Sequence, residues 1–149
     1  MSQLSEMDKL QTIIDIESIK SLKALYFRSM DTKDWKVLAS CFTEDLVADF
    51  RDAPGMFVEG RENYMAQISE VLKDASTVHH GHIPEIEMID GLNATGVWSM
   101  EDIVKLPGLF IQGWGHYHET YRKELEGWKI SRIKLTRLRL VLNGEEQDV

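Results

Sequence analysis

Four strand-like segments follow one another in the second half of the chain, and a short turn separates each from the next. They cover residues 78–89, 94–106, 109–123 and 128–141. Segments joined this closely pair as antiparallel neighbours, because a parallel pair needs a long crossover connection. The sequence therefore predicts a sheet built from consecutive hairpins.

Helical patterns precede these strands. Apolar residues recur at three- and four-residue spacings over residues 10–30, which predicts a long amphipathic helix. Ser5 and Asp8 have the spacing of a capping box at its start, and Asp34 can cap a short second helix. A third helical pattern covers about residues 60–74. Helices followed by hairpin-linked strands indicate an α+β fold, in which a curved sheet, mixed or antiparallel, wraps around the N-terminal helices and leaves a pocket inside.

Length and charge limit the possible classes of protein. A chain of 149 residues with 43% hydrophobic content can bury the core of one domain, which we expect to span residues 1–149 with residues 144–149 as a frayed tail. A formal net charge of −8 argues against a nucleic-acid partner or an anionic membrane surface. The single cysteine excludes an intramolecular disulfide, and no apolar stretch reaches membrane length, so we expect a cytoplasmic protein.

Asp102 is the most unusual ionisable residue of the chain. Strand alternation places it on the same face as Trp98, Met100 and Val104, which is apolar enough to face a core. Burying an unmatched polar group costs roughly 2–7 kcal/mol, and a charge costs more unless it is paired or neutralised. Asp102 therefore indicates either a carboxyl group with a function or one that a buried arginine or backbone amides hold in place.

Three further residues suggest proton-transfer chemistry. His79 lies on the segment that opens the sheet, and a carboxylate on one ring nitrogen would fix its tautomer and raise its basicity. Asp31, at the end of the long helix, could supply that carboxylate. Tyr26, five residues earlier, could donate a hydrogen bond to a carbonyl or an enolate. Each residue also has an ordinary structural interpretation, as core packing, helix cap or interior histidine.

The histidines allow a competing interpretation as a metal site. His80 and His82 lie close to His79, and His116 forms a second pair with His118. Such pairs can bind zinc or iron. However, alternation puts His79 on the face opposite His80 and His82, and the fixed glutamate spacing of defined metal motifs is missing. The sequence favours surface or pocket-lining histidines, so we predict no metal site.

Large apolar side chains suggest that the pocket takes flat apolar molecules. The candidate lining residues are Trp35, Phe50, Phe57, Trp98, Met100, Phe110, Trp114 and Tyr117.

Over nearly its full length the chain resembles the SnoaL-like branch of the nuclear-transport-factor-2-like superfamily. Residues 16–31 are similar to the first helix of bile acid 7α-dehydratase, which carries a site tyrosine and a site aspartate. Residues 79–86 are similar to its histidine strand, and residues 94–102 to the strand with a second site aspartate. Arg137 falls where that enzyme family has a site arginine. The separation of Asp31 and His79 also resembles that in hexachlorocyclohexane dehydrochlorinase, and scytalone dehydratase is a more distant analogue.

The resemblance implies a cone-shaped fold with a deep apolar pocket and a lyase that needs no cofactor. Its substrate would be an apolar cyclic molecule with a ketone, steroid-like or from aromatic degradation, from which the enzyme eliminates water or, as a second option, a hydrogen halide. His79 would be the general base, Asp31 would orient it, and Tyr26 would hold the enolate oxygen. Asp102 would either protonate the departing hydroxyl group or pair with Arg137.

Two other functions remain open at this point. The same residues could catalyse a double-bond shift like that of a ketosteroid isomerase, in which the abstracted proton returns to the substrate. Alternatively, the chain could be a non-catalytic small-molecule-binding module, although such a pocket gains little from several buried titratable groups. The resemblance also implies a homo-oligomer, either a trimer or a dimer.

Overall fold

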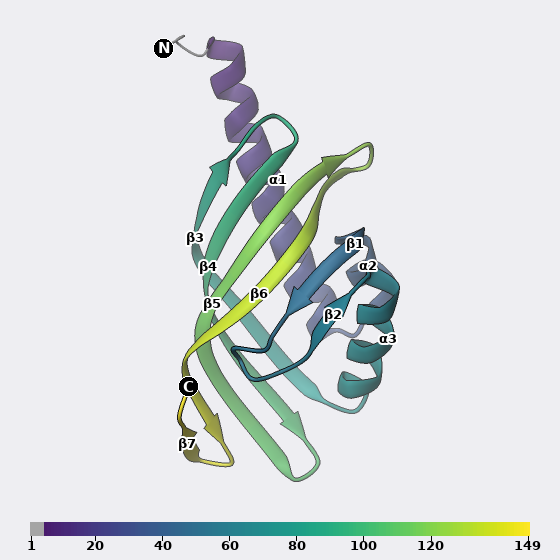
Figure 1. The fold of residues 1–149 in the computed structure, drawn as a ribbon, viewed down its shortest axis with the longest axis vertical. Helices are drawn as coiled ribbons and strands as arrows, with labels where there is room; N and C mark the ends of the chain where they lie inside the picture. Colours follow the sequence, from purple (N-terminus) through teal and green to yellow (C-terminus); the bar gives the residue numbers. More distant parts are fainter. Residues whose placement is uncertain (1–4) are drawn as a thin grey trace.

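The computed structural model describes residues 5–149, so the first four residues of the predicted 1–149 domain lie outside it. In this part of the chain, helices lie against one strongly curved sheet (Figure 1). The helices are α1 (Glu6–Asp31), α2 (Trp35–Ser40) and α3 (Arg61–Leu72). The strands are β1 (Phe42–Asp49), β2 (Phe57–Glu59), β3 (Ser76–Met88), β4 (Asn93–Leu106), β5 (Leu109–Glu124), β6 (Gly127–Leu142) and β7 (Glu145–Gln147).

The helix starts follow the signals in the sequence. Ser5 and Asp8 form the predicted capping box: the Asp8 amide donates to Ser5 Oγ at 3.0 Å, and the Ser5 amide donates to Asp8 Oδ2 at 3.2 Å. Asp34 caps α2 as predicted, because its Oδ1 accepts a hydrogen bond from the Val37 amide at 3.2 Å. Local hydrogen bonding therefore defines both helix starts.

The sheet runs in the order β2-β1-β6-β5-β4-β3, with β7 paired to β6. The strands β3 to β6 form the predicted succession of antiparallel hairpins. In contrast, β1 pairs parallel to β6, which makes the sheet mixed. The prediction of an α+β fold with a curved sheet around N-terminal helices is confirmed, although the sheet stays open rather than closing on itself.

The C-terminal residues do not form the frayed tail that the sequence suggested. Residues 145–147 form β7, which pairs antiparallel with residues 140–142 of β6. Asn143 and Gly144 join the two strands with φ values of +50° and +81°. An Asn-Gly pair readily adopts this left-handed backbone and favours a tight hairpin, so a local turn signal continues the sheet.

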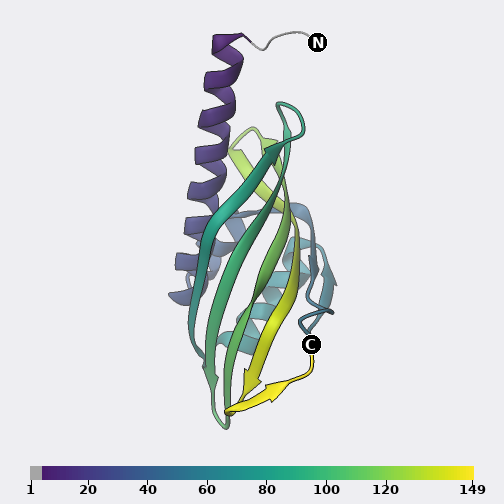
Figure 2. The ribbon, with the colours of Figure 1, turned by 90° about the vertical axis from the view of Figure 1, so that its left-hand side faces the viewer.

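The C-terminal half of α1 packs against the sheet, and its N-terminal half extends beyond it (Figures 1 and 2). Ile19, Leu22 and Tyr26 are buried, whereas Leu10 and Ile13 are 51% and 59% exposed. The predicted apolar stripe therefore has the right period, but only part of it meets the core. No helix within residues 5–149 combines the length and the apolar character that a membrane-spanning segment requires.

Lys23 and Glu119 form an ion pair inside the core that the sequence analysis did not identify. Lys23 Nζ lies 2.9 Å from Glu119 Oε2, and both side chains are 0% exposed. The hydroxyl group of Tyr121 donates to Glu119 Oε1 at 2.8 Å, and Trp98 Nε1 donates to the Tyr121 oxygen at 2.9 Å. These contacts join α1 to β4 and β5 and satisfy the buried carboxylate.

Removing one member of this pair should destabilise the protein far more than removing both charges. Lys23→Met leaves the Glu119 carboxylate buried without a countercharge, which typically costs about 3–5 kcal/mol in the free energy of unfolding. The double variant Lys23→Met/Glu119→Gln removes both charges and should recover most of that loss. Urea-induced unfolding measures both values, and a single variant as stable as the unmodified protein would contradict the expectation.

Candidate active site

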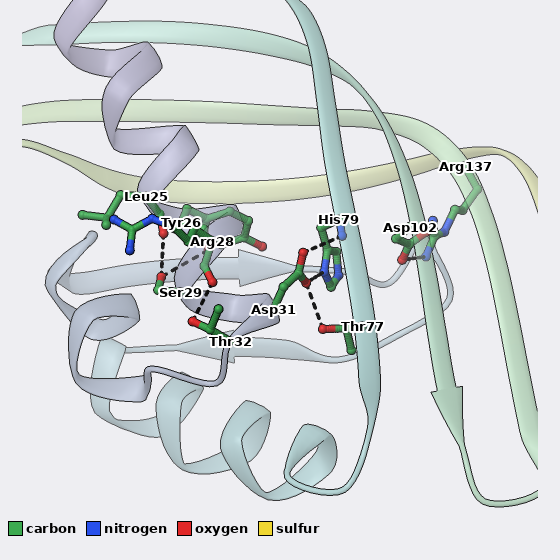
Figure 3. Close-up of polar contacts among 10 residues, drawn as sticks. All are labelled: Leu25, Tyr26, Arg28, Ser29, Asp31, Thr32, Thr77, His79, Asp102 and Arg137. Carbon is green, nitrogen blue, oxygen red and sulfur yellow. Dashed lines mark hydrogen bonds and ion pairs between the residues drawn. The ribbon is translucent and has the colours of Figure 1, made fainter.

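The strand register brings the predicted site residues of the sheet into one row. His79 of β3 faces Asp102 of β4, and Asp102 faces Gly113 of β5. Arg137 comes from β6, and its guanidinium group approaches Gly113 closely. Figure 3 shows it directed toward Asp102. The remaining predicted residues, Tyr26 and Asp31, lie on α1. The packing of this helix on the sheet completes the set.

The Asp31 carboxylate binds both the backbone amide and the side chain of His79 (Figure 3). Asp31 Oδ1 lies 2.7 Å from His79 Nδ1, and Asp31 Oδ2 accepts a hydrogen bond from the His79 amide at 2.8 Å. The Thr77 hydroxyl group donates to Asp31 Oδ1 at 2.9 Å. Because Asp31 occupies Nδ1, Nε2 is the ring nitrogen that can act on a molecule in the cavity.

The charged form of Asp31 is stabilised despite partial burial. Burial acts to raise the pKa of this carboxyl group, but the hydrogen bonds from His79 and Thr77 outweigh it and lower the pKa from its ordinary value of 3.8. Asp31 is therefore ionised at neutral pH. An ionised Asp31 favours the tautomer in which Nδ1 carries the hydrogen and Nε2 is the basic nitrogen.

Asp102 forms a two-point ion pair with Arg137. The guanidinium Nη1 lies 2.6 Å from Oδ1 and Nη2 lies 3.1 Å from Oδ2, and each side chain is 7% exposed. Of the two arrangements that the sequence left open for Asp102, the structure has the pairing with Arg137. Such a bidentate contact is strong and geometrically specific, and it engages both oxygens of the Asp102 carboxyl group. The Nε atom of Arg137 also lies 3.4 Å from the Ala53 carbonyl oxygen, which links the pair to the segment between β1 and β2.

Gly113 makes room for this pair and was not singled out in the sequence. A Cβ atom at this position would clash with Arg137 Nη1 and Asp102 Oδ1. The missing side chain opens a gap in the inner face of β5, through which Arg137 reaches β4. A glycine inside a strand is the only local signal of such a close approach.

Four of the five predicted site residues line one cavity of about 240 Å³: Tyr26, His79, Asp102 and Arg137. Asp31 is not among its lining residues and lies behind the His79 ring. Two further tyrosines, Tyr64 and Tyr117, also line the cavity. The apolar part of its wall consists of Met30, Phe50, Met56, Ile68, Val71, Leu72, Val104, Leu106, Ile111 and Leu135.

The predicted aromatic lining is only partly correct. Phe50 and Tyr117 line the cavity. The other candidates lie elsewhere: Trp98 and Met100 are buried in the core, and Trp35 packs against it. Phe57 and Phe110 are exposed, and the Trp114 ring lies under the Arg139 guanidinium. Sequence reasoning missed Tyr64 and the contribution of α3, because the docking of a helix on a distant strand leaves no local pattern.

The two histidine pairs lie away from this cavity. His80 Nδ1 and His82 Nε2 contact Glu101 Oε1 at 3.3 and 3.4 Å on the opposite face of the sheet from His79. On β5, His118 Nε2 lies 3.1 Å from the Thr136 hydroxyl group. Within residues 5–149, no three His, Cys, Asp or Glu side chains have the arrangement of a metal site.

The lowered pKa of Asp31 predicts a pH-dependent contribution to stability. The charged form of Asp31 is favoured in the folded state. This contribution is therefore fully present above the pKa that Asp31 has in the unfolded chain, and it is lost as the pH falls through the lower pKa that Asp31 has in the folded protein. The difference in unfolding free energy between the unmodified protein and Asp31→Asn should therefore shrink as the pH falls below about 5. Urea unfolding at several pH values tests this, with the exposed-site variant Asp74→Asn as control. A difference that does not vary with pH would contradict it.

Comparisons with known proteins identify the family and the fold. The model of the SnoaL-like domain family matches residues 11–134. Among solved structures, a candidate scytalone dehydratase from Novosphingobium aromaticivorans is 20% identical with a TM-score of 0.80, over 95% of this chain and 93% of that chain. A hexachlorocyclohexane dehydrochlorinase, LinA type 3 from Novosphingobium barchaimii, is 15% identical with a TM-score of 0.79, over 95% and 98%.

A third similar structure is a protein of Novosphingobium aromaticivorans described as NTF2-like with a cystatin-like fold. It is 21% identical with a TM-score of 0.74, over 93% of this chain and 92% of that chain. At these identities the three structures establish the fold. The family model matches most of the chain, and the protein therefore belongs to the family of SnoaL-like domains.

Proposed function

We propose that this protein is a lyase that needs no cofactor and eliminates water from an apolar cyclic substrate bearing a ketone. The observation that carries the proposal is the 2.7 Å contact of His79 Nδ1 with Asp31, which leaves the other ring nitrogen for chemistry in a largely apolar cavity. The names of two similar structures, a dehydratase and a dehydrochlorinase, both denote eliminations and support this class of reaction.

The reaction would begin when His79 Nε2 removes a proton from the carbon next to the ketone. Asp31 stabilises the resulting imidazolium, and the electron pair of the broken C–H bond moves to the carbonyl oxygen. Tyr26, which lines the cavity, donates a hydrogen bond to this enolate oxygen. Burial is the main cause that raises the pKa of Tyr26 well above 10, so its hydroxyl group stays protonated and remains a donor.

Collapse of the enolate would then expel the hydroxyl group from the neighbouring carbon and form the double bond. The departing group needs a proton to leave as water. Arg137 engages both oxygens of Asp102, so we assign this proton to the His79 imidazolium. The guanidinium N–H groups of Arg137 that Asp102 does not use can hold the leaving oxygen.

The size of the cavity favours a small substrate. Its volume of about 240 Å³ lies below the range of roughly 300–1,000 Å³ that is typical of pockets for drug-sized ligands. We therefore favour one ring or two fused rings over a tetracyclic steroid, which agrees with an intermediate of aromatic degradation. The homo-oligomer and the cytoplasmic location that the sequence suggested stay predictions.

One observation favours a second reaction, a double-bond isomerisation. Arg137 is bound to the carboxyl oxygens of Asp102. Among His79, Asp102 and Arg137, this leaves His79 as the group that can both remove a proton from the substrate and return it. Returning the proton to another carbon of the same substrate needs no separate acid. The mass of the product distinguishes the two reactions, since isomerisation conserves it and dehydration removes one water.

The His79→Ala variant should lose turnover by roughly 100- to 10,000-fold while its fold remains intact. Mass spectrometry of incubations with monocyclic, bicyclic and steroidal β-hydroxyketones measures the loss of water. The matched control is His80→Ala, which changes the neighbouring histidine on the opposite face of the sheet. A folded His79→Ala protein with full activity would rule out the assignment. Binding without turnover across the whole panel would favour the non-catalytic module.

Gly113→Ala should lower turnover although it replaces no ionisable residue. Its methyl group would displace Arg137 from Asp102, so we expect a loss of at least about tenfold in kcat/KM, from the misplaced guanidinium. The matched control is Gly91→Ala, because nothing lies within 4 Å of an added Cβ at that turn position. Steady-state kinetics would compare the two variants, and equal activity would show that the Asp102–Arg137 pair has no part in catalysis.

A further inference from the structure

We propose that Lys23 is a positioning residue of this site, whose ammonium group strengthens Tyr26 and Tyr117 as hydrogen-bond donors to an oxyanion in the cavity. The inference rests on the proposed function, because it assumes that negative charge develops on a substrate oxygen beside these hydroxyl groups. Lys23 itself does not line the cavity and would act only through the two rings.

The ammonium group lies over the faces of three aromatic rings, of which Tyr26 and Tyr117 are the nearer two and Phe27 is the third, at 4.7 Å. Lys23 Nζ is 3.8 Å from the centroid of the Tyr26 ring and 3.7 Å from that of the Tyr117 ring. The two rings meet edge to face, with centroids 6.1 Å apart and an angle of 82° between their planes. Both tyrosines also line the cavity, whereas Lys23 does not. The ammonium group therefore contacts the cavity only indirectly, through each of these two phenol rings.

Glu119 favours the charged form of Lys23 in this position. Burial is the larger influence and lowers the pKa of the lysine from its ordinary value of 10.5, although the charge and hydrogen bond of Glu119 oppose that effect. A neutral amine would leave the Glu119 carboxylate buried without a countercharge, which is costly. Besides the two tyrosines, the Cys41 thiol is a titratable group near Lys23; burial raises its pKa to about 11, so it is uncharged at neutral pH.

A cation over a phenol ring stabilises negative charge on that phenol. When Tyr26 or Tyr117 donates a hydrogen bond to an enolate, part of the enolate charge moves onto the phenol oxygen and its ring. The nearby ammonium lowers the free energy of this state more than that of the neutral ground state. An interaction that strengthens in the transition state raises kcat and changes KM little. Both phenols remain donors, because burial raises the pKa of each well above 10.

The alternative is that Lys23 and Glu119 only stabilise the core. The two roles can be separated with Lys23→Met/Glu119→Gln, which removes both charges and keeps an acceptor for the Tyr121 hydroxyl group. Lys23→Gln/Glu119→Gln is a second neutral pair that can retain a direct hydrogen bond between the side chains. The matched control is Asp15→Asn/Lys123→Met, since Asp15 and Lys123 form an ion pair at 3.0 Å and line no part of the cavity.

The experiment uses 4-nitrophenol as a probe, because its phenolate imitates an enolate oxygen and has a different absorption spectrum from the neutral phenol. Spectra of the bound probe at several pH values give its pKa in each protein. We expect the unmodified protein and the control pair to lower the pKa of the probe below its value in free solution. In both Lys23/Glu119 double variants this pKa should be about one unit higher than in the unmodified protein, a tenfold loss of preference for the phenolate. Turnover of a substrate should show the same tenfold loss in kcat with KM unchanged.

Two results would overturn the inference. If the neutral pairs fold and bind the phenolate as well as the unmodified protein does, Lys23 has only a structural role. If the unmodified protein shows no preference for the phenolate, the cavity has no oxyanion site, and the function of Tyr26 in the proposed reaction fails as well. Loss of turnover in His79→Ala together with unchanged phenolate binding in the neutral pairs would leave the proposed lyase standing and reject only the role of Lys23.

Discussion

Ile19, Leu22, Tyr26 and Met30 pack one face of α1 against the sheet, and the positions of the functional groups depend on this contact. The same helix carries Tyr26 at the cavity and Asp31 behind His79. The energy for this arrangement comes from burial of apolar surface, which has no direction of its own. The polar contacts at the end of the helix then determine its register against β3.

The charged groups of the core follow one rule, which is that each has a partner of opposite charge or a set of hydrogen bonds. Asp102 is paired with Arg137, and Glu119 is paired with Lys23. His79 differs, because only one of its ring nitrogens is held. His79 therefore keeps one nitrogen that can exchange a proton, whereas the paired residues provide constant charges around it.

Much of the site could be predicted because unusual residues occur in regular patterns. Asp102 stood out since strand alternation placed a carboxylate on an apolar face, and its burial confirms that reading. Its partner could not be chosen from the pattern, because Arg137 reaches it only through the gap at Gly113. Lys23 was overlooked for a similar reason. A lysine on a helix normally faces solvent, and only the position of Glu119 on a distant strand makes its burial possible.

The sequence alone determined the element order, the helix starts and the antiparallel succession of β3 to β6, because caps, turns and alternation act over a few residues. It also determined which face of β4 is buried. The tertiary structure alone decided the parallel pairing of β1 with β6, the pairing of Lys23 with Glu119 and the walls of the cavity. These features join residues that lie far apart along the chain, and no local pattern encodes which distant side chain will fill a given space.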